Sequence, residues 1–191
     1  MRIIAGMSKG KTLFSPTHNT RPTSDRAREG LFSSLESEFG SMNELHILDL
    51  FAGTGAVGVE ALSRGATQVH AVEKDENAAA VCMKNFNLVP HESTQVHCFK
   101  MSAIVFVQEN RGVEYDIIFM DPPYEIANET IEKMLSDIHL YKLLQPRGII
   151  AIERATKSNP FTWPAPFALE KIRSYGQGSI FYGGYSASVL P

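Results

Sequence analysis

Long apolar runs and cysteine are both scarce in this sequence. No stretch approaches the ~20 consecutive apolar residues that a membrane-spanning helix needs, and the opening residues MRIIAGMSKGKTLF lack the apolar core of a secretory signal. The two cysteines, Cys82 and Cys98, show no CxxC spacing. We therefore expect a cytoplasmic protein that does not contact membranes, with buried reduced thiols that do not act as nucleophiles.

Metal-ligand patterns are equally scarce. None of the histidines stands at ligand spacing from another histidine or from a cysteine, so the sequence predicts no metal site. They are His18, His46, His70, His91, His97 and His139. Hydrophobic residues make up 43% of the 191 and charged residues 20%, which is typical of a globular protein with a substantial core. Nothing in the sequence indicates an obligate protein partner.

Charge is distributed unevenly along the chain. Residues 1–30 contain six lysines and arginines against two acids, whereas the remainder has twelve against nineteen. A basic arm on an acidic body suggests contact with a polyanion such as nucleic acid, although chance clustering on a solvated surface gives the same pattern.

Hydrophobic periodicity predicts a hairpin and a helix, followed by an alternating strand–helix body. The alternation predicts an α/β fold in which helices cover both faces of a mostly parallel sheet. We expect an appended N-terminal part over 1–40 and a main domain over 41–191. Strands are expected at 2–5, 11–14, 46–51, 68–73, 95–99, 115–120, 148–153, 167–174 and 179–185, the last two antiparallel. Helices are expected from about 24 to 39 and at 56–64, 76–88, 103–109 and 128–138.

A glycine loop joins the first strand of this body to its helix. Gly53, Gly55 and Gly58 fit the GxGxxG pattern, and Glu73 ends the next strand twenty residues after Gly53. Glycines permit a tight turn and close approach of a ligand, the helix N-terminus offers unpaired N–H groups, and the acid can hold ribose hydroxyls. The pattern fits a nicotinamide cofactor and S-adenosylmethionine alike. Asp49 favours the second, because it would repel a pyrophosphate and attract an ammonium group.

The sequence Asp121-Pro122-Pro123-Tyr124 follows the apolar strand that contains Ile117. Ligands of open α/β sheets bind outside the carboxyl ends of strands. Two prolines remove two N–H donors and stiffen the backbone, so carbonyl groups can face a ligand. The Asp121 carboxylate and the Pro122 carbonyl then provide two acceptors for the hydrogens of an exocyclic amine.

Methylation of such an amine needs this arrangement. The nitrogen lone pair of a base amine is delocalised into the ring, and two acceptors favour a more tetrahedral, more nucleophilic nitrogen. Alignment supplies much of the acceleration, and Asp121 stabilises the positive charge that develops on nitrogen. Tyr124 offers a face on which a flipped or unpaired base can stack.

These segments together resemble a known family. The segment 21–32 (RPTSDRAREGLF), DLFAGTGAVGVEALSRGA over 49–66, Glu73 and the FMDPPY sequence are similar to the RsmD-type bacterial small-subunit ribosomal RNA guanine-N2 methyltransferases. The glycine loop and DPPY identify a superfamily of amino-methyltransferases, and the RPT segment narrows it to this family. The resemblance implies a class I methyltransferase fold, a Rossmann-like sheet of seven strands with the last inserted antiparallel. It also implies a guanine in ribosomal RNA, within a small-subunit particle, as the substrate.

The resemblance also assigns residues to roles. It implies S-adenosyl-L-methionine as the cofactor and catalysis by Asp121, Pro122, Pro123 and Tyr124. It also implies RNA contacts from Tyr124 and from residues 21–28, which we call the basic segment. The cofactor-binding residues expected are Asp49, Phe51, Gly53, Gly55, Glu73, Lys74, Ser102 and Asp121. The RNA-binding residues expected in the basic segment are Arg21, Thr23, Arg26 and Arg28. Ser102 departs from the family, which usually has Asp or Asn there to bond the adenine amino group; a serine reaches less far and is uncharged.

Three other functions fit parts of the pattern. The same chemistry serves adenine N6 or cytosine N4 in DNA or RNA, or a protein glutamine. An inactive module that binds the cofactor and RNA would keep the fold, but the presence of Asp49, Glu73, Asp121 and Tyr124 argues against it. A nicotinamide-dependent oxidoreductase is disfavoured because no acid–base pair is evident.

Overall fold

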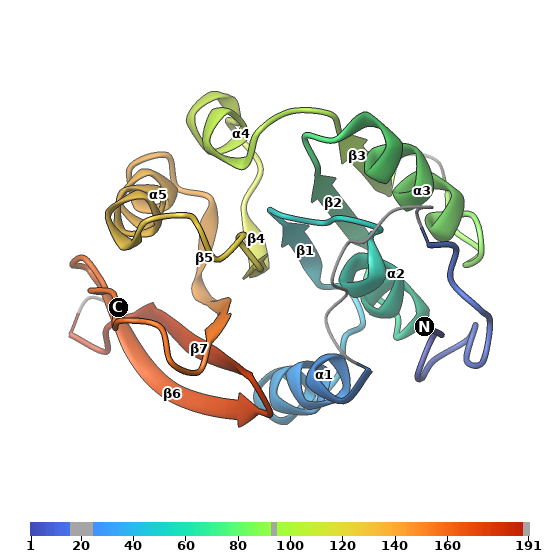
Figure 1. Ribbon diagram of the computed structural model, residues 1–191, viewed down its shortest axis with the longest axis horizontal. Coiled ribbons are helices and arrows are strands. Elements are labelled where there is room, and N and C mark those ends of the chain that lie inside the picture. Colours follow the sequence, from blue (N-terminus) through green and yellow to red (C-terminus); the bar gives the residue numbers. More distant parts are fainter. Residues whose placement is uncertain (16–24, 93–94, 189–191) are drawn as a thin grey trace. The chain divides into compact units, whose positions relative to one another are not determined.

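A computed structural model describes residues 1–15, 25–92 and 95–188 of the chain (Figure 1). The described residues form two compact units, unit 1 over Met1–Ala103 and unit 2 over Ile104–Pro191. The predicted division near residue 40 falls inside unit 1 and remains a prediction. Within the described ranges, no helix combines the length and apolar character needed to cross a bilayer.

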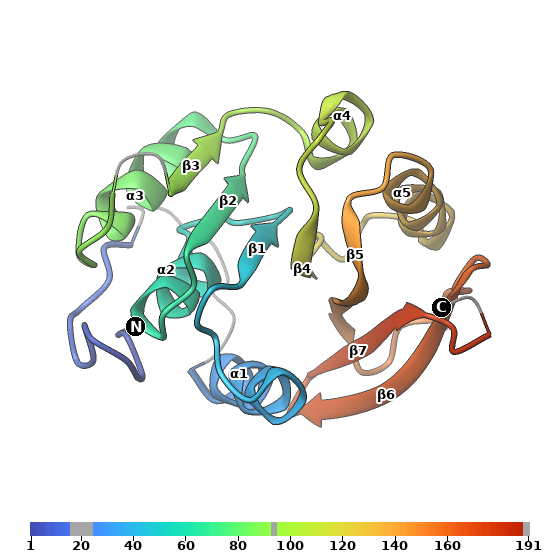
Figure 2. The same cartoon turned by 180° about the vertical axis from the view of Figure 1, so that it is seen from behind.

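Unit 1 is built on three parallel strands, β1 (His46–Asp49), β2 (Gln68–Val72) and β3 (Val96–Phe99). β2 lies between the other two, with Asp49 opposite Ala71 and Ala71 opposite Cys98 (Figure 2). The strands connect through two helices, α2 (Ala56–Ser63) and α3 (Glu76–Phe86). Every residue of α2 is buried, and all but Glu60 are small or apolar.

The N-terminal part of unit 1 contains the predicted hairpin in reduced form and the predicted helix. One antiparallel bridge joins Arg2 to Thr12, so only a single step of the expected pairing forms. Helix α1 (Asp25–Phe39) buries Leu31, Phe32 and Leu35, the apolar stripe expected from the sequence. It ends before Gly40, whose positive φ of 78° is a conformation that glycine adopts without strain.

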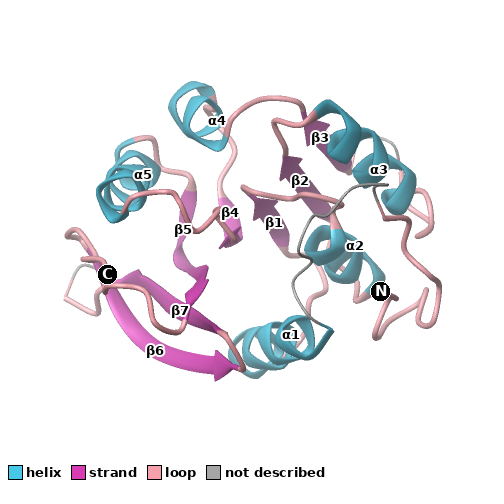
Figure 3. Ribbon diagram, viewed as in Figure 1, coloured by secondary structure: helices cyan, strands magenta, loops and turns pink. Residues whose placement is uncertain are grey.

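Unit 2 contains four paired strands, β4 (Tyr115–Met120), β5 (Leu144–Ala155), β6 (Phe167–Tyr175) and β7 (Gly178–Tyr185). β4 and β5 are parallel, whereas β7 is antiparallel to both β5 and β6 and lies between them (Figure 3). The final strand is therefore inserted antiparallel, as the sequence and the resemblance predicted. Helices α4 (Ala103–Glu109) and α5 (Asn128–Leu140) flank β4 in the chain, and 156–166 contains no helix.

Several predicted bounds shift by a few residues. β1 ends at Asp49 instead of Phe51, because Leu50 and Phe51 enter the glycine loop. β5 begins at Leu144 instead of Gly148, through an irregular pairing with β4 that accommodates Pro146. The bounds of α4 and β4 match those predicted.

Candidate active site

The glycine loop (residues 50–55) turns tightly between β1 and α2. Gly53 and Gly55 have φ values of 53° and 75°, and the Gly55 N–H donates to the Ala52 carbonyl at 2.7 Å. A β-carbon on Gly55 would lie 2.5 Å from the Cys82 sulfur, so glycine is required there by space as well as by conformation. A β-carbon on Gly53 would meet no atom within 4 Å. The loop therefore has open space beside Gly53, where a ligand can approach the backbone.

Glu73 directly follows β2 and faces this loop. One carboxylate oxygen accepts the Gly53 N–H at 2.8 Å, and the other accepts the Asp75 N–H at 2.8 Å. The structure thus brings together two residues, Gly53 and Glu73, that the sequence assigned to one cofactor. Asp75 in turn caps α3 by accepting the Ala78 N–H at 2.8 Å.

The other residues predicted for the cofactor differ in exposure. Asp49, at the end of β1, is only 1% exposed, and a carboxylate this deeply buried needs a polar or charged partner. Phe51 and Ser102 are half-buried, and Lys74 is exposed. These four residues belong to unit 1, whereas Asp121, which is also predicted for the cofactor, belongs to unit 2. The carboxylate and hydroxyl groups of unit 1 suit a ligand with an ammonium group, ribose hydroxyls and an adenine.

Asn85 on α3 braces the glycine loop from behind, a role that was not predicted. Its amide nitrogen donates to the Thr54 carbonyl at 2.8 Å and to the Phe14 carbonyl at 3.1 Å, and its amide oxygen accepts the Phe14 N–H at 2.7 Å. The side chain is fully buried. One carboxamide therefore joins the loop, the helix and the N-terminal segment.

In unit 2, Asp121-Pro122-Pro123-Tyr124 begins a turn that we call the DPPY turn (residues 121–126). It follows β4, whose last four residues are buried. Asp121 is half-buried, Pro122 is buried, and Tyr124 is 42% exposed. The Ile126 N–H donates to the Pro123 carbonyl at 3.0 Å, which closes the turn. An accessible aromatic ring thus stands two residues after Pro122.

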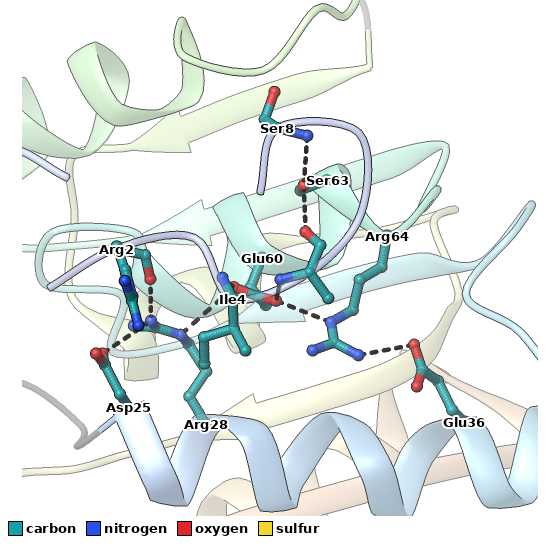
Figure 4. A network of polar contacts seen from close by, with 10 residues as sticks. Arg2, Ile4, Ser8, Asp25, Arg28, Glu36, Glu60, Ser63 and Arg64 are labelled. Atoms are coloured by element: carbon teal, nitrogen blue, oxygen red, sulfur yellow. Dashed lines mark hydrogen bonds and ion pairs between the residues drawn. The ribbon is translucent and has the colours of Figure 1, made fainter. Parts of the chain in front are cut away.

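The basic segment contains an arginine with a different role from the one predicted. Arg28 is 0% exposed; it forms ion pairs with Asp25 at 3.0 Å and Glu60 at 3.7 Å, and it donates to the Arg2 carbonyl (Figure 4). Burial lowers the pKa of this guanidinium, and the carboxylates of Glu60 and Asp25 oppose that shift. A buried guanidinium offers no surface to an RNA phosphate. We therefore correct the expectation that Arg28 binds RNA and assign it to the packing of unit 1.

Glu60 is the centre of this network. Its two carboxylate oxygens accept the N–H groups of Ile4 at 2.8 Å and Ala5 at 2.9 Å, and Arg64 pairs with it at 2.9 Å (Figure 4). Arg64 also reaches Glu36 on α1 at 2.9 Å. The network fixes the N-terminal segment and α1 to α2, and no local pattern in the sequence predicts it.

The other arginine of the basic segment within the described residues is Arg26, and it is exposed. Arg21, Thr23 and His18 lie outside the described residues. Arg26 therefore keeps the position that an RNA contact requires, on the first turn of α1.

The cysteines and the metal-ligand residue types form no second reactive centre in the part of the chain that the structure describes. Cys82 is buried and Cys98 half-buried, so the prediction of buried thiols is confirmed for the first. A hydrogen bond to Cys98, together with burial, raises the pKa of the Cys82 thiol and makes it a poor nucleophile. The same described residues include no group of three or more His, Cys, Asp or Glu arranged to hold a metal ion.

Comparison with known proteins places these features in one family. The family described as Conserved hypothetical protein 95 matches residues 1–183. Ribosomal RNA small subunit methyltransferase D of Haemophilus influenzae is 32% identical over 180 residues, which are 92% of this chain and 89% of that protein. The protein of the same name from Escherichia coli K12 is also 32% identical over 180 residues, 93% of this chain and 86% of that one.

Solved structures agree with the sequence relatives. A structure described as a putative methyltransferase, yhhF from Escherichia coli, superposes with a TM-score of 0.83 at 28% identity, and the match covers 98% of each chain. The seven strands and their mixed directions, together with this neighbour, confirm the expected class I methyltransferase fold. The chain therefore belongs to the Conserved hypothetical protein 95 family, the RsmD family of methyltransferases.

Proposed function

We propose that this protein transfers a methyl group from S-adenosyl-L-methionine to the exocyclic N2 amine of a guanine in small-subunit ribosomal RNA. The observation that carries the proposal is the DPPY turn, with half-buried Asp121, buried Pro122 and exposed Tyr124 directly after a buried strand. The name shared by the relatives, ribosomal RNA small subunit methyltransferase D, supports the RNA as substrate.

The residues around the glycine loop fit the cofactor. Asp49 would hold the ammonium group, and the open space at Gly53 admits the ligand to the loop backbone. Glu73 would hold the ribose hydroxyls, and Ser102 would accept from the adenine amine, with Phe51 and Lys74 beside them. When bound, the cofactor supplies an electrophilic methyl group on a sulfonium.

The DPPY turn would hold and activate the amine. The Asp121 carboxylate and the Pro122 carbonyl accept the two amine hydrogens, which orients the nitrogen lone pair and stabilises the positive charge that develops there. Tyr124 stacks against the base, which must be flipped out or already unpaired to reach the turn. Such stacking contributes about 1–3 kcal/mol in single-strand binders.

The decisive experiment uses cofactor labelled in its methyl group and small-subunit particles from cells that lack this protein. We expect label on N2 of one guanine, found by mapping the modified nucleotide. Naked ribosomal RNA as a parallel substrate shows whether the assembled particle is needed. Label on adenine N6, cytosine N4, DNA or a protein glutamine would contradict the guanine assignment, and no label on any of them would indicate an inactive binding module.

The basic segment is tested by a pair of arginine variants. Arg26→Ala should weaken RNA binding and reduce the slope of log affinity against log salt by about 1 or less, because one phosphate contact is lost. Arg28→Ala should instead lower the free energy of unfolding by about 1–3 kcal/mol, because the Arg2 carbonyl loses its donor and Glu60 loses one of its two arginine partners. An unchanged salt slope in Arg26→Ala would remove that residue from the RNA-binding surface.

A further inference from the structure

Arg154 is a buried arginine on β5 that none of the features above explains. Its side chain is 4% exposed. The paired register of β4 and β5 ends with Met120 opposite Ile152, so Arg154 stands two residues beyond the last pair, where β4 has given way to the DPPY turn. Within the described part of the chain, no carboxylate forms an ion pair with it, unlike Arg28.

The Arg154 guanidinium bonds to the backbone of the DPPY turn instead. One terminal nitrogen donates to the Pro123 carbonyl at 3.3 Å, and the other donates to the Ile126 carbonyl at 3.0 Å. These two carbonyls bracket Tyr124 in the chain. A single planar group therefore fixes both sides of the backbone that carries the exposed aromatic ring.

The composition of the turn explains why such a group is needed. Pro122 and Pro123 have no N–H, so these two positions offer no donor through which other elements can hold the backbone. Carbonyl oxygens are the groups that remain, and they require a donor. The arginine guanidinium has several N–H donors in a rigid fork and no hydrogen-bond acceptor. This geometry suits two carbonyl oxygens at a fixed spacing.

We propose that Arg154 is a positioning residue for methyl transfer, which acts by holding Tyr124 in the orientation that receives the target base. This proposal rests on the proposed function of the DPPY turn. Arg154 itself does not touch the reacting atoms. Its loss leaves Asp121 and the cofactor residues in place but lets the ring of Tyr124 move, so the base is held less well for in-line attack.

Two variants test the proposal. Arg154→Met removes all donors while keeping a long side chain, and Arg154→Lys keeps the charge but cannot bond to both carbonyls as a fork. We expect methyl transfer at saturating cofactor to fall about 10²-fold in Arg154→Met, the cost of a misplacement of about 1 Å. A smaller loss is expected in Arg154→Lys. Affinity for S-adenosylhomocysteine should change less than about threefold, because, among the described residues, Arg154 donates to the Pro123 and Ile126 carbonyls and to none of the residues predicted for the cofactor.

A double-mutant cycle with Tyr124→Ala distinguishes positioning from a merely structural role. If Arg154 acts through the ring, then Arg154→Lys should have almost no further effect on methyl transfer once Tyr124 is alanine. If the fold-loss of the double variant instead equals the product of the two single losses, the proposal is overturned, because Arg154 then acts independently of Tyr124. Melting temperature measured on all four proteins shows whether each is folded, and the cycle is evaluated with the lysine variant if the methionine variant fails to fold.

Arg147→Lys is the matched control, since Arg147 is an exposed arginine near the start of the same strand. It should transfer methyl groups as the unchanged protein does. If the unchanged protein transfers no methyl group to any amine, the proposed function fails. If it transfers normally and both Arg154 variants do as well, only the inference about Arg154 fails.

Discussion

The glycine loop of unit 1 and the DPPY turn of unit 2 both follow a buried parallel strand, yet different kinds of side chain brace them. The loop is held by an acceptor, the Glu73 carboxylate on the Gly53 N–H, and by the Asn85 carboxamide on the Thr54 carbonyl. The DPPY turn receives two donors from one side chain, the Arg154 guanidinium on the Pro123 and Ile126 carbonyls.

The difference follows from what each backbone has to offer. A glycine loop keeps all its N–H groups, so an acidic side chain can brace it, and a ligand can later take over that acceptor. The DPPY turn has no N–H at its two prolines, so at those two positions a side chain can brace the backbone only by donating to a carbonyl. The comparison predicts that changes at the loop alter cofactor binding, whereas changes at the turn alter methyl transfer.

Among changes in the DPPY turn, Asp121→Ala should have the largest effect on methyl transfer. We expect methyl transfer to fall by about 10²–10³-fold, because a preorganised group that stabilises developing charge is removed. Affinity for S-adenosylhomocysteine, measured by calorimetry, should be largely retained. Glu129→Ala, at an exposed carboxylate on the first turn of α5, is the control. Loss of cofactor binding together with transfer would break the distinction between the turn and the loop.

Glu73→Ala, beside the glycine loop, should reduce cofactor affinity more than methyl transfer. A hydrogen bond to a charged group contributes about 1.5–3 kcal/mol, so affinity for S-adenosylhomocysteine should fall about 10- to 100-fold. Transfer at saturating cofactor should change much less. Glu76→Ala, which removes a surface carboxylate paired with Lys100, should leave affinity unchanged. Equal losses in the two variants would mean that general charge, and not the position of Glu73, attracts the cofactor.

Asn85→Leu should lower the free energy of unfolding by about 1–3 kcal/mol, because the Thr54 carbonyl and the Phe14 backbone groups lose a buried partner. Chemical denaturation measures this effect. Asn87→Ala, an exposed asparagine one helical position beyond α3, should cost no more than about 0.5 kcal/mol. A variant as stable as the unchanged protein would show that the glycine loop does not depend on Asn85.

Acid should weaken unit 1 through His70, which lies on the strand that ends before Glu73. Burial lowers the pKa of His70 to about 4, and the facing His97 and His46 add to the shift; Gln68 and Phe99 also contact the ring. Between pH 6.5 and 4 the unfolded chain binds a proton that native His70 does not, so stability falls as pH decreases through this range.

His70→Gln should therefore lose less stability than the unchanged protein between pH 7 and pH 5, by on the order of 1 kcal/mol. Hydrogen exchange sharpens the test, since the Gly53 amide reports on the loop and the Ile126 amide on the turn. In the unchanged protein, acid should lower the protection of the Gly53 amide, relative to its intrinsic exchange rate at the same pH, more than that of the Ile126 amide. The same acid response in both proteins would rule out His70 as the source.

Sequence predicted the parts of the molecule that local pattern determines. The order of strands and helices from α1 onward, the antiparallel ending and the apolar stripe of α1 follow from periodicity and turn residues, and all are present. The strands expected at 2–5 and 11–14 are reduced to one bridge. The proximity of Gly53 and Glu73 was predictable because adjacent parallel strands end at one edge. The exact ends of strands, such as the exclusion of Leu50 and Phe51 from β1, could not be predicted, because pairing between strands decides where a strand ends.

The buried polar side chains could not be predicted from the sequence. Asn85 meets Phe14 across 71 positions, and Arg154 meets Pro123 across 31. Arg28 was assigned to a basic surface because charge in a sequence does not reveal burial. Which arginine faces solvent depends on a carboxylate such as Glu60 being brought to it by the fold.

The anchoring of the N-terminal segment by Glu60 has a consequence for synthesis. The segment is made before its partner, because the acceptor of its Ile4 N–H lies 56 positions later in the chain. At about 5–20 residues per second, translation leaves the segment without that acceptor for about 3–11 s. The segment therefore cannot reach its final position until α2 has emerged from the ribosome.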